Sequence, residues 1–341
     1  MPPIVLHLPT QSADRQEPES KGQAGNIYAL ADLTVFQVTG VDAVSFLQGQ
    51  ITNDIASGNT NIAKLAGYCT AQGRLLATMV LNVYPDQESG IPMVIGLLKK
   101  DLGQAVVKRL NMFILRSKVK LSLTETLVYG IKASEEQVLI LEQMLSHDLP
   151  RQPWQTVHAA SGTWICAPSF NGYRLWWMAT SEQFEQQSNI LNACTSRSAN
   201  EWHALDIRCG LPWIETSTQD LFIPQTLNLD LIDGVSFTKG CYPGQEIVAR
   251  SHYRGTLKRR MNLGYIDNLV NILPGSDIFD QHHPEQPCGR LINAAQDENV
   301  TRILFEATFE ATGHNALRLG GADGPDITLD PLPYDLQPTK A

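Results

Sequence analysis

The order of two hydrophobic periods along the chain constrains the fold most. In residues 26–117, and again in 118–199, strands with alternating apolar residues combine with helices whose apolar residues recur every three or four positions. Beyond residue 261 only short strand-like runs remain, and turn residues separate them. This order predicts an α+β fold in which two mixed units precede a C-terminal antiparallel β-barrel.

Helix boundaries are best marked in the second of these units. Ser134 followed by Gln137, and Thr180 followed by Gln183, have the spacing of capping boxes, so we expect one helix to begin at each serine or threonine. In the first unit, Gly49 is expected to end a short helix over residues 42–48. The other predicted elements are strands at 35–38, 75–83, 118–134, 164–166 and 173–178 and a helix from about Lys99.

The charge is unevenly distributed along an acidic chain. The net charge is −9, yet residues 239–260 contain six basic side chains and a single acidic one, Glu246. Such a run is often a solvated face. The alternative is a binding site for a polyanion, such as a polyglutamate tail or a tRNA backbone. In that case residues 250–260 would make a weak contact with tRNA.

The cysteines indicate a reducing compartment. Six are scattered without a Cys-x-x-Cys pair, and the segment after Met1 does not resemble a secretory leader, so we expect a cytoplasmic protein. No apolar run approaches the roughly 20 residues that span a bilayer, so we expect no membrane contact.

His282, His283 and Cys288 are close in sequence, but the prolines around them favour an exposed loop, and we predict no metal site.

Residues 239–246, Lys-Gly-Cys-Tyr-Pro-Gly-Gln-Glu, form the most informative motif. Its central Tyr-Pro-Gly-Gln predicts a type II turn. Cys241 would then lie directly before a rigid turn that leads into a helix. The nearby helix N-terminus and Lys239 would favour the thiolate, the nucleophilic and metal-binding form. The alternative is that Cys241 is a small buried residue of the turn.

This motif resembles the signature of the YgfZ-type folate-binding proteins, relatives of the aminomethyltransferase of glycine cleavage. Segments 46–50, 222–229, 234–237, 246–250 and 331–334 resemble the same family in the same order. The resemblance implies a three-domain aminomethyltransferase-like ring that binds tetrahydrofolate or another reduced folate, and a role in maintaining iron–sulfur enzymes, including radical enzymes that modify tRNA. The predicted domains are a flexible arm (1–25), a folate-binding α+β domain (26–117 plus 200–255), a second, ferredoxin-like α+β domain (118–199) and the barrel (256–341).

The resemblance also suggests where a folate would bind. Trp202 matches a family tryptophan of the folate site and would form a stacking wall, while Arg250 or Arg254 would neutralise the glutamate tail. Leu33 and Arg208 occupy positions where relatives carry a second tryptophan and an acidic residue; Asp206 or Glu215 would have to replace the latter. The remaining predicted site residues are Lys239 and Cys241 as the reactive pair and Tyr242, Gln245 and Glu246 at the folate.

Two positions bear on catalysis. Aminomethyltransferases resemble this chain around residues 72–76 and then place an aspartate, where this chain has Ala77 and Thr78. Neither residue can act as a carboxylate base. We therefore predict a folate-binding accessory protein with a reactive Cys241. The alternatives are a tetrahydrofolate-dependent aminomethyl or methyl transferase and a tRNA-binding module.

Overall fold

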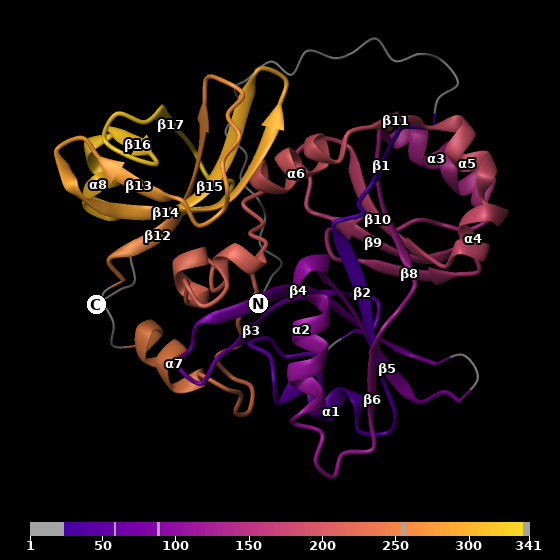
Figure 1. Ribbon diagram of the computed structural model, residues 1–341. Helices are drawn as coiled ribbons and strands as arrows, with labels where there is room; N and C mark the ends of the chain where they lie inside the picture. Colours follow the sequence, from indigo (N-terminus) through magenta and orange to yellow (C-terminus); the bar gives the residue numbers. More distant parts are fainter. Residues whose placement is uncertain (1–23, 58, 87–88, 254–256, 337–341) are drawn as a thin grey trace.

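The computed structural model describes residues 24–336 except 58, 87–88 and 254–256. Figure 1 shows the barrel at the upper left, one mixed unit at the upper right and the other below it. Three units thus surround a common centre, as predicted.

The first unit is built on a five-stranded sheet with the order β3-β4-β5-β2-β6. Helix α2 packs against β2, β5 and β6 through Leu102, Val106 and Leu110, which recur at helical spacing and are all buried. The elements of this unit are β2 (Leu33–Thr39), α1 (Ala43–Gln48), β3 (Lys64–Cys69), β4 (Leu75–Pro85), β5 (Pro92–Lys99), α2 (Lys100–Asn111) and β6 (Lys120–Leu123).

The second unit is built on a six-stranded sheet with the order β11-β1-β7-β10-β9-β8. Its chain order β7-α3-β9-β10-α5-β11 is the βαββαβ pattern of ferredoxin-like folds, with β1 inserted between β11 and β7. The elements are β1 (Asn26–Ala29), β7 (Leu127–Ala133), α3 (Glu135–Leu145), β8 (Thr156–Ala159), β9 (Gly162–Ala167), β10 (Tyr173–Ala179), α4 (Ser181–Gln186), α5 (Ser188–Ala193) and β11 (Thr195–Arg197).

Both predicted capping boxes are present. The Ser134 side chain accepts the backbone N–H of Gln137, whose own side chain accepts the N–H of Ser134, and Thr180 and Gln183 make the same reciprocal pair. The helix after Thr180 is not continuous, however. It breaks at Gln187, where the backbone leaves the helical region, so α4 and α5 replace one predicted helix.

The predicted boundary between the first two units is wrong at two strands. β1 follows the N-terminal arm in sequence but pairs with β7 and β11 of the second sheet, whereas β6 lies beyond residue 117 and pairs with β2 of the first sheet. The two units therefore exchange strands, and the single predicted strand over 118–134 is two strands in two sheets. Residues 1–23 of the predicted arm lie outside the described residues.

The C-terminal unit is a closed antiparallel barrel with the strand order β12-β15-β14-β13-β16-β17. Its interior is filled by buried aliphatic and aromatic side chains such as Ile278, Leu291 and Phe305. The predicted C-terminal antiparallel barrel is confirmed. The elements are β12 (Arg259–Ile266), β13 (Asp277–Asp280), β14 (His283–Asp297), β15 (Val300–Thr308), α8 (Phe309–His314), β16 (Leu317–Leu319) and β17 (Asp326–Asp330).

The segment 199–253 joins the three units. Helix α6 (Ala199–Arg208) contacts β1 of the second sheet and β14 and β15 of the barrel. It is followed by two 3₁₀ turns, η1 (Thr216–Thr218) and η2 (Pro224–Leu227), and by α7 (Gln245–Tyr253). One hydrophobic core continues from the first sheet through α6 to barrel residues such as Leu263 and Leu304.

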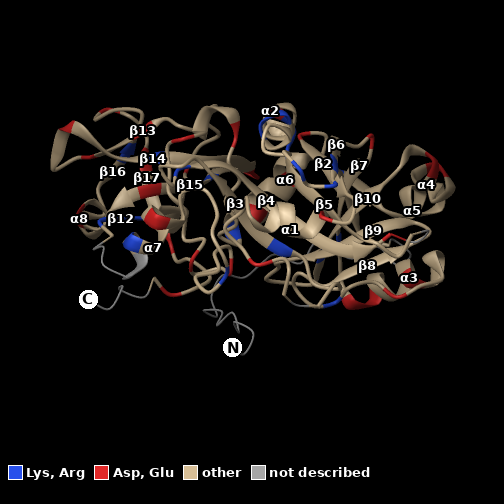
Figure 2. Cartoon of the chain, turned by 90° about the horizontal axis from the view of Figure 1, so that it is seen from below, with Lys and Arg blue, Asp and Glu red and all other residues tan. Residues whose placement is uncertain are grey.

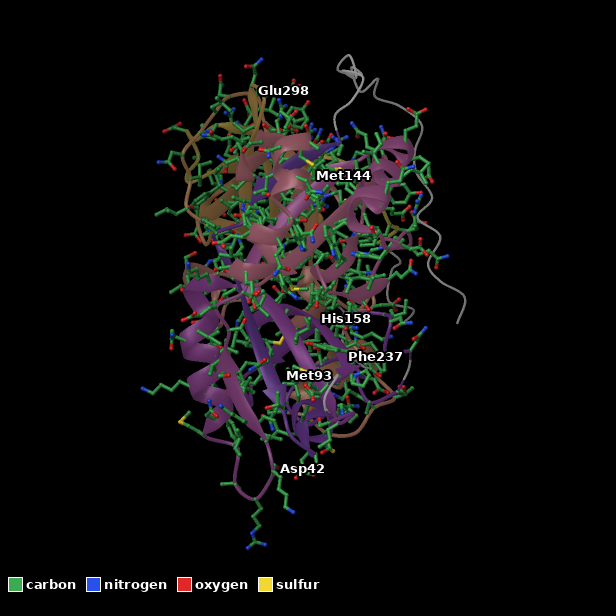
Figure 3. The ribbon with its side chains drawn as sticks, turned by 90° about the vertical axis from the view of Figure 1, so that its right-hand side faces the viewer. Asp42, Met93, Met144, His158, Phe237 and Glu298 are labelled. Atoms are coloured by element: carbon green, nitrogen blue, oxygen red, sulfur yellow. The ribbon has the colours of Figure 1, made fainter. Side chains whose placement is uncertain are left out.

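A cleft of about 410 Å³ separates the faces of the two sheets, and Met93 and His158, labelled in Figure 3, lie on its wall. His158 stacks on Tyr84 with ring centroids 3.9 Å apart, and its two nitrogens face Thr163 Oγ1 at 2.9 Å and Asn82 Oδ1 at 2.7 Å. Burial lowers the pKa of His158 to about 4, so this imidazole is neutral at pH 7.

Candidate functional site: the Cys241 loop and the unit junction

The turn predicted around Pro243 is present. Gln245 donates its backbone N–H to the Tyr242 carbonyl at 3.2 Å, and Gly244 has φ +83°, the positive value that a type II turn requires. Helix α7 begins at Gln245. Cys241 precedes the turn and is exposed, so the prediction of a thiol accessible at a rigid turn fits the structure better than a buried cysteine.

Close backbone contact holds the turn against the loop between β3 and β4. A Cβ atom built on Gly244 would lie 2.5 Å from the Thr70 carbonyl oxygen and 2.6 Å from Gly73 Cα, so only glycine fits at this position. Gly73 also has a positive φ, +74°, and faces Ile247 of α7. Two glycines from distant segments therefore fix the position of the Cys241 loop relative to the first sheet.

Lys239, which was expected to act with the Cys241 thiolate, donates its hydrogen bonds to backbone carbonyls. Its buried ammonium donates to the carbonyl oxygens of Gln48 at 2.5 Å, Ile51 at 2.7 Å and Asn53 at 2.9 Å. Burial lowers the pKa of Lys239 to about 8. Because an ammonium has three N–H donors and all three are used here, Lys239 has none left to donate to the Cys241 thiolate. Lys239 therefore anchors the loop to the segment after α1, and its expected effect on the thiolate does not include a hydrogen bond.

The other residues of the motif are divided between the interior and the surface. Tyr242 is buried with its ring 5.2 Å from Lys239 Nζ, and burial raises its pKa. Gln245 is half-buried at the start of α7. Glu246 and Arg250 are exposed and pair one helical turn apart at 2.9 Å. Figure 2 shows acidic positions in red and basic positions in blue around α7. The remaining cation expected here, Arg254, lies outside the described residues.

Part of the basic segment 239–260 is buried rather than exposed on the surface. Arg260 is buried and makes two bonds to the Asp230 carboxylate, at 2.5 and 2.9 Å, with both side chains under 5 % exposed. Arg259 faces Glu306 at 3.3 Å. The expectation of a continuous polyanion site over 250–260 is therefore wrong at Arg260, which has an internal counter-ion.

Trp202 does not present an open ring face in this structure. The side chain is fully buried in α6, and a Cβ on Gly130 of β7 would lie 2.3 Å from its ring. The Arg174 guanidinium lies 4.2 Å from the ring centroid and Tyr28 packs at 5.5 Å. The predicted stacking wall is thus corrected to a core residue, because neighbouring side chains and the β7 backbone cover the ring.

Asp206 is also committed to a structural role. Its carboxylate pairs with Arg174 at 2.5 Å, with both side chains 3 % exposed or less, and accepts the indole N–H of Trp213 at 3.0 Å. This ion pair joins β10 to α6. Arg208, two residues further along α6, lies 5.8 Å from the ring centroid of Phe170. Of the two acids considered as replacements at the pterin, only Glu215 retains exposed surface.

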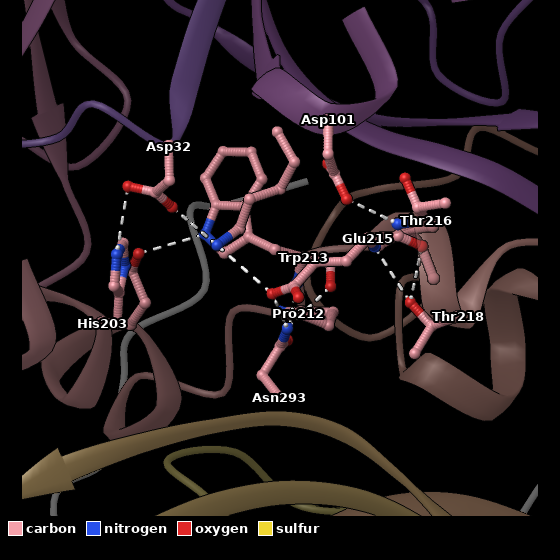
Figure 4. A network of polar contacts seen from close by, with 12 residues as sticks. Asp32, Asp101, His203, Pro212, Trp213, Glu215, Thr216, Thr218 and Asn293 are labelled. Carbon is pink, nitrogen blue, oxygen red and sulfur yellow. Dashed lines mark hydrogen bonds and ion pairs between the residues drawn. The ribbon is translucent and has the colours of Figure 1, made fainter. Parts of the chain in front are cut away.

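Glu215 belongs to a polar network where the units meet, shown in Figure 4. Lys99, the last residue of β5, contacts Asp32 at 2.8 Å and Glu215 at 3.3 Å, and His203 of α6 reaches Asp32 at 3.2 Å. Leu33 lies opposite Lys99 in the β2–β5 register. Although burial acts to raise it, the pKa of Asp32 is well below its ordinary value because His203 and Lys99 donate to its carboxylate.

The barrel and β4 join the same network. Asn293 of β14 donates to the Trp213 carbonyl at 2.8 Å and to Glu215 Oε1 at 3.2 Å. The Thr78 hydroxyl donates to the Pro212 carbonyl at 3.1 Å and accepts the N–H of Ile214 at 3.0 Å. The network therefore contains residues of the first unit, of the barrel and of the segment that joins the units. Sequence reasoning missed Asp32, Lys99 and His203 because they belong to no motif.

Strand β4 connects the Cys241 loop with the polar network at the unit junction. Gly73, just before the strand, touches the Cys241 loop, and Thr78 touches the junction segment. Five residues of extended chain span roughly 16 Å. The Cys241 loop and the junction, with its partly exposed carboxylates, thus contact the two ends of one short stretch of backbone.

Comparison with solved structures defines the class of fold. The chain is similar to the glycine cleavage system aminomethyltransferase T from Bartonella henselae, with a TM-score of 0.69 and 11 % identity over 93 % of this chain and 88 % of that one. This is the aminomethyltransferase fold. None of the protein-family models matches the chain.

Sequence relatives are more specific. The chain is 32 % identical over 240 residues to the tRNA-modifying protein YgfZ of Hamiltonella defensa, covering 69 % of this chain and 68 % of that protein. It is 29 % identical to the protein of that name from Photorhabdus laumondii over 92 % of this chain and 94 % of the relative. It therefore belongs to the YgfZ family. Across the described ranges, each helix is too short or too polar to cross a membrane.

Proposed function

We propose that this protein binds a reduced folate and supports tRNA modification, with Cys241 as its reactive thiol. The observation that carries the proposal is the exposed Cys241, held on a turn that Lys239 and Gly244 fix to the first sheet, in a chain whose relatives are named tRNA-modifying proteins. Such rigid placement at the surface suits a thiol that meets a large partner. The cytoplasmic location remains a prediction.

The unit junction supplies polar groups that fit a folate. The Asp32 and Glu215 carboxylates are 39 % and 26 % exposed, and a carboxylate can accept two hydrogen bonds from the aminopyrimidine edge of a pterin. The aromatic part of the fit is weaker, because Trp202 is covered. We therefore place the pterin of tetrahydrofolate at Asp32 and Glu215 rather than against Trp202.

The position of the Cys241 loop fits the other end of the same ligand. A folate is elongated, and the loop lies one short stretch of β4 away from the junction. Arg250 is exposed on α7 beside the loop and can neutralise a glutamate carboxylate, although it would have to release Glu246. Tyr242 and Gln245 of the loop are further candidates for contact with the folate, and Arg254 is a candidate from the sequence alone.

Cys241 is proposed to act on iron–sulfur enzymes, including the radical enzymes that modify tRNA. A surface thiolate can ligate iron or form a transient adduct with a partner. Lys239 supports this role by holding the loop.

The alternative of an aminomethyl or methyl transferase is less well supported. Ala77 is fully buried, and the Thr78 hydroxyl donates one hydrogen bond to the 212–214 segment and accepts one from it. No carboxylate is thus present at these positions, where an aminomethyltransferase places its base.

Anaerobic calorimetric titration of tetrahydrofolate tests the folate proposal. We expect saturable binding to the wild-type protein, weakened at least about tenfold by Asp32→Asn or Glu215→Gln, since each removes a charge-assisted acceptor. Glu185→Gln, at an exposed position of α4 in the second unit, is the matched acid-to-amide control and should bind within about twofold of wild type. No binding to the wild type, or equal binding by all variants, would contradict the placement.

A further inference from the structure

A cluster of two imidazoles and a carboxylate lies in the barrel, apart from both regions described above. Asp280 is the last residue of β13, His282 follows two residues later, and His314 is the last residue of α8. One ligand atom from each of the three lies within 4.8 Å of the other two. The sequence had drawn attention to His282, His283 and Cys288, but the fold groups His282 with Asp280 and a distant histidine instead.

The carboxylate is buried and directed between the two rings. Asp280 is 2 % exposed; its Oδ1 lies 3.2 Å from His282 Nδ1 and its Oδ2 lies 2.5 Å from His314 Nδ1. The backbone N–H of His282 also donates to Oδ1 at 3.0 Å. The histidines are 57 % and 32 % exposed, so an ion can reach the ring nitrogens from solvent.

The backbone brings these segments together without a metal. Gln281 donates its N–H to the Ala316 carbonyl at 2.9 Å, and Asp280 is in register with Leu317 of β16. Asn315, with φ +53°, ends α8 and turns the chain back toward β16. The cluster is therefore fixed by strand pairing and a helix terminus, which gives a preformed arrangement of ligands.

We propose that Asp280, His282 and His314 bind a divalent transition-metal ion of the zinc class. Two imidazoles and one carboxylate are a donor set that zinc and its neighbours accept, whereas magnesium and calcium prefer oxygen alone. Tetrahedral zinc with bonds of about 2.0–2.1 Å places neighbouring ligand atoms about 3.3 Å apart. Small rotations of the two exposed rings achieve this spacing, and each ring then carries its proton on Nε2. The fourth position is open to water.

Cobalt(II) titration of the reduced, full-length protein under anaerobic conditions tests this site, because the visible spectrum reports both geometry and ligand type. We expect one equivalent to bind wild-type protein without the near-ultraviolet charge-transfer band of a thiolate ligand. Affinity should fall well over tenfold in His282→Gln and His314→Gln, since even partners of metal ligands contribute about 10–100-fold. Zinc should raise the melting temperature of the wild type and not of these variants.

His283→Gln is the matched control, because His283 neighbours His282 but faces Glu285 at 3.8 Å. It should bind cobalt as the wild type does. Both ligand variants alter exposed side chains, and Asp280→Asn provides a third test whose fold is checked by circular dichroism. Absence of binding to the wild type, or unchanged affinity in His282→Gln and His314→Gln, would overturn the proposal. So would a thiolate band that disappears in Cys288→Ser or Cys241→Ser.

Discussion

Replacing Gly244 by alanine is predicted to destabilise the protein and to release the Cys241 loop from the first sheet. The matched control is Gly240→Ala in the same loop, because a Cβ on Gly240 meets no atom within 4 Å. Both variants add one methyl group four residues apart. They differ in the contacts and backbone conformation at the site.

The magnitude follows from two features of Gly244. Alanine at a φ of +83° is strained, which costs about 1–2 kcal/mol. The new Cβ would also lie 2.5 Å from the Thr70 oxygen and 2.6 Å from Gly73 Cα, and both are backbone atoms. Relief of such a contact by backbone movement costs about 1–3 kcal/mol. We therefore expect the free energy of unfolding to fall by about 2–5 kcal/mol in Gly244→Ala and by less than about 0.5 kcal/mol in Gly240→Ala.

Urea unfolding of the two variants measures these free energies. Native-state hydrogen exchange should also show faster exchange of the amides of residues 244–248 in Gly244→Ala, because the turn and the first turn of α7 lose their support. Equal stability and equal exchange in the two variants would refute the account of how the loop is positioned.

Two further predictions concern buried ionisable groups. Asp206→Asn leaves the Arg174 guanidinium buried without a counter-ion and should lower the free energy of unfolding by about 3–5 kcal/mol. Glu201→Gln, in a half-buried pair on the same helix, should cost under about 1 kcal/mol. Similar losses in the two variants would contradict the role assigned to Asp206. The lowered pKa of His158, about 4 against an ordinary 6.5, means that the unfolded chain takes up a proton before the folded one. Stability should therefore fall by about 2–3 kcal/mol between pH 6.5 and pH 4 through this group. Denaturant curves should show a shallower fall for His158→Gln, and an unchanged pH dependence would exclude His158 as the cause.

Local features of the fold were predictable from the sequence. The capping boxes at Ser134 and Thr180 depend on residues three positions apart, and the turn at Gly244 depends on adjacent ones, so their signals are contained in short segments. The barrel was predicted from its strand lengths and turn residues. The exchange of β1 and β6 between sheets was not, because strand pairing depends on contacts between distant segments.

In the candidate site, too, local features were predictable from the sequence and contacts between distant segments were not. The motif identified Cys241 and the turn that carries it. The partners of Lys239 are backbone carbonyls about 190 positions away in sequence, as in the Lys239–Gln48 contact, and carbonyls have no sequence signature. The resemblance led to the expectation that Trp202 lines the folate site, but whether its ring is open or covered depends on Gly130 in another strand.

The central claim is that the exposed Cys241 thiol serves tRNA modification. The most direct measurement is mass spectrometry of tRNA nucleosides from a bacterial strain that lacks its own family member and carries the wild-type gene, Cys241→Ser or Cys288→Ser. The account predicts that wild type and Cys288→Ser restore the modified nucleosides and that Cys241→Ser does not, at equal protein levels. Full restoration by Cys241→Ser would contradict it.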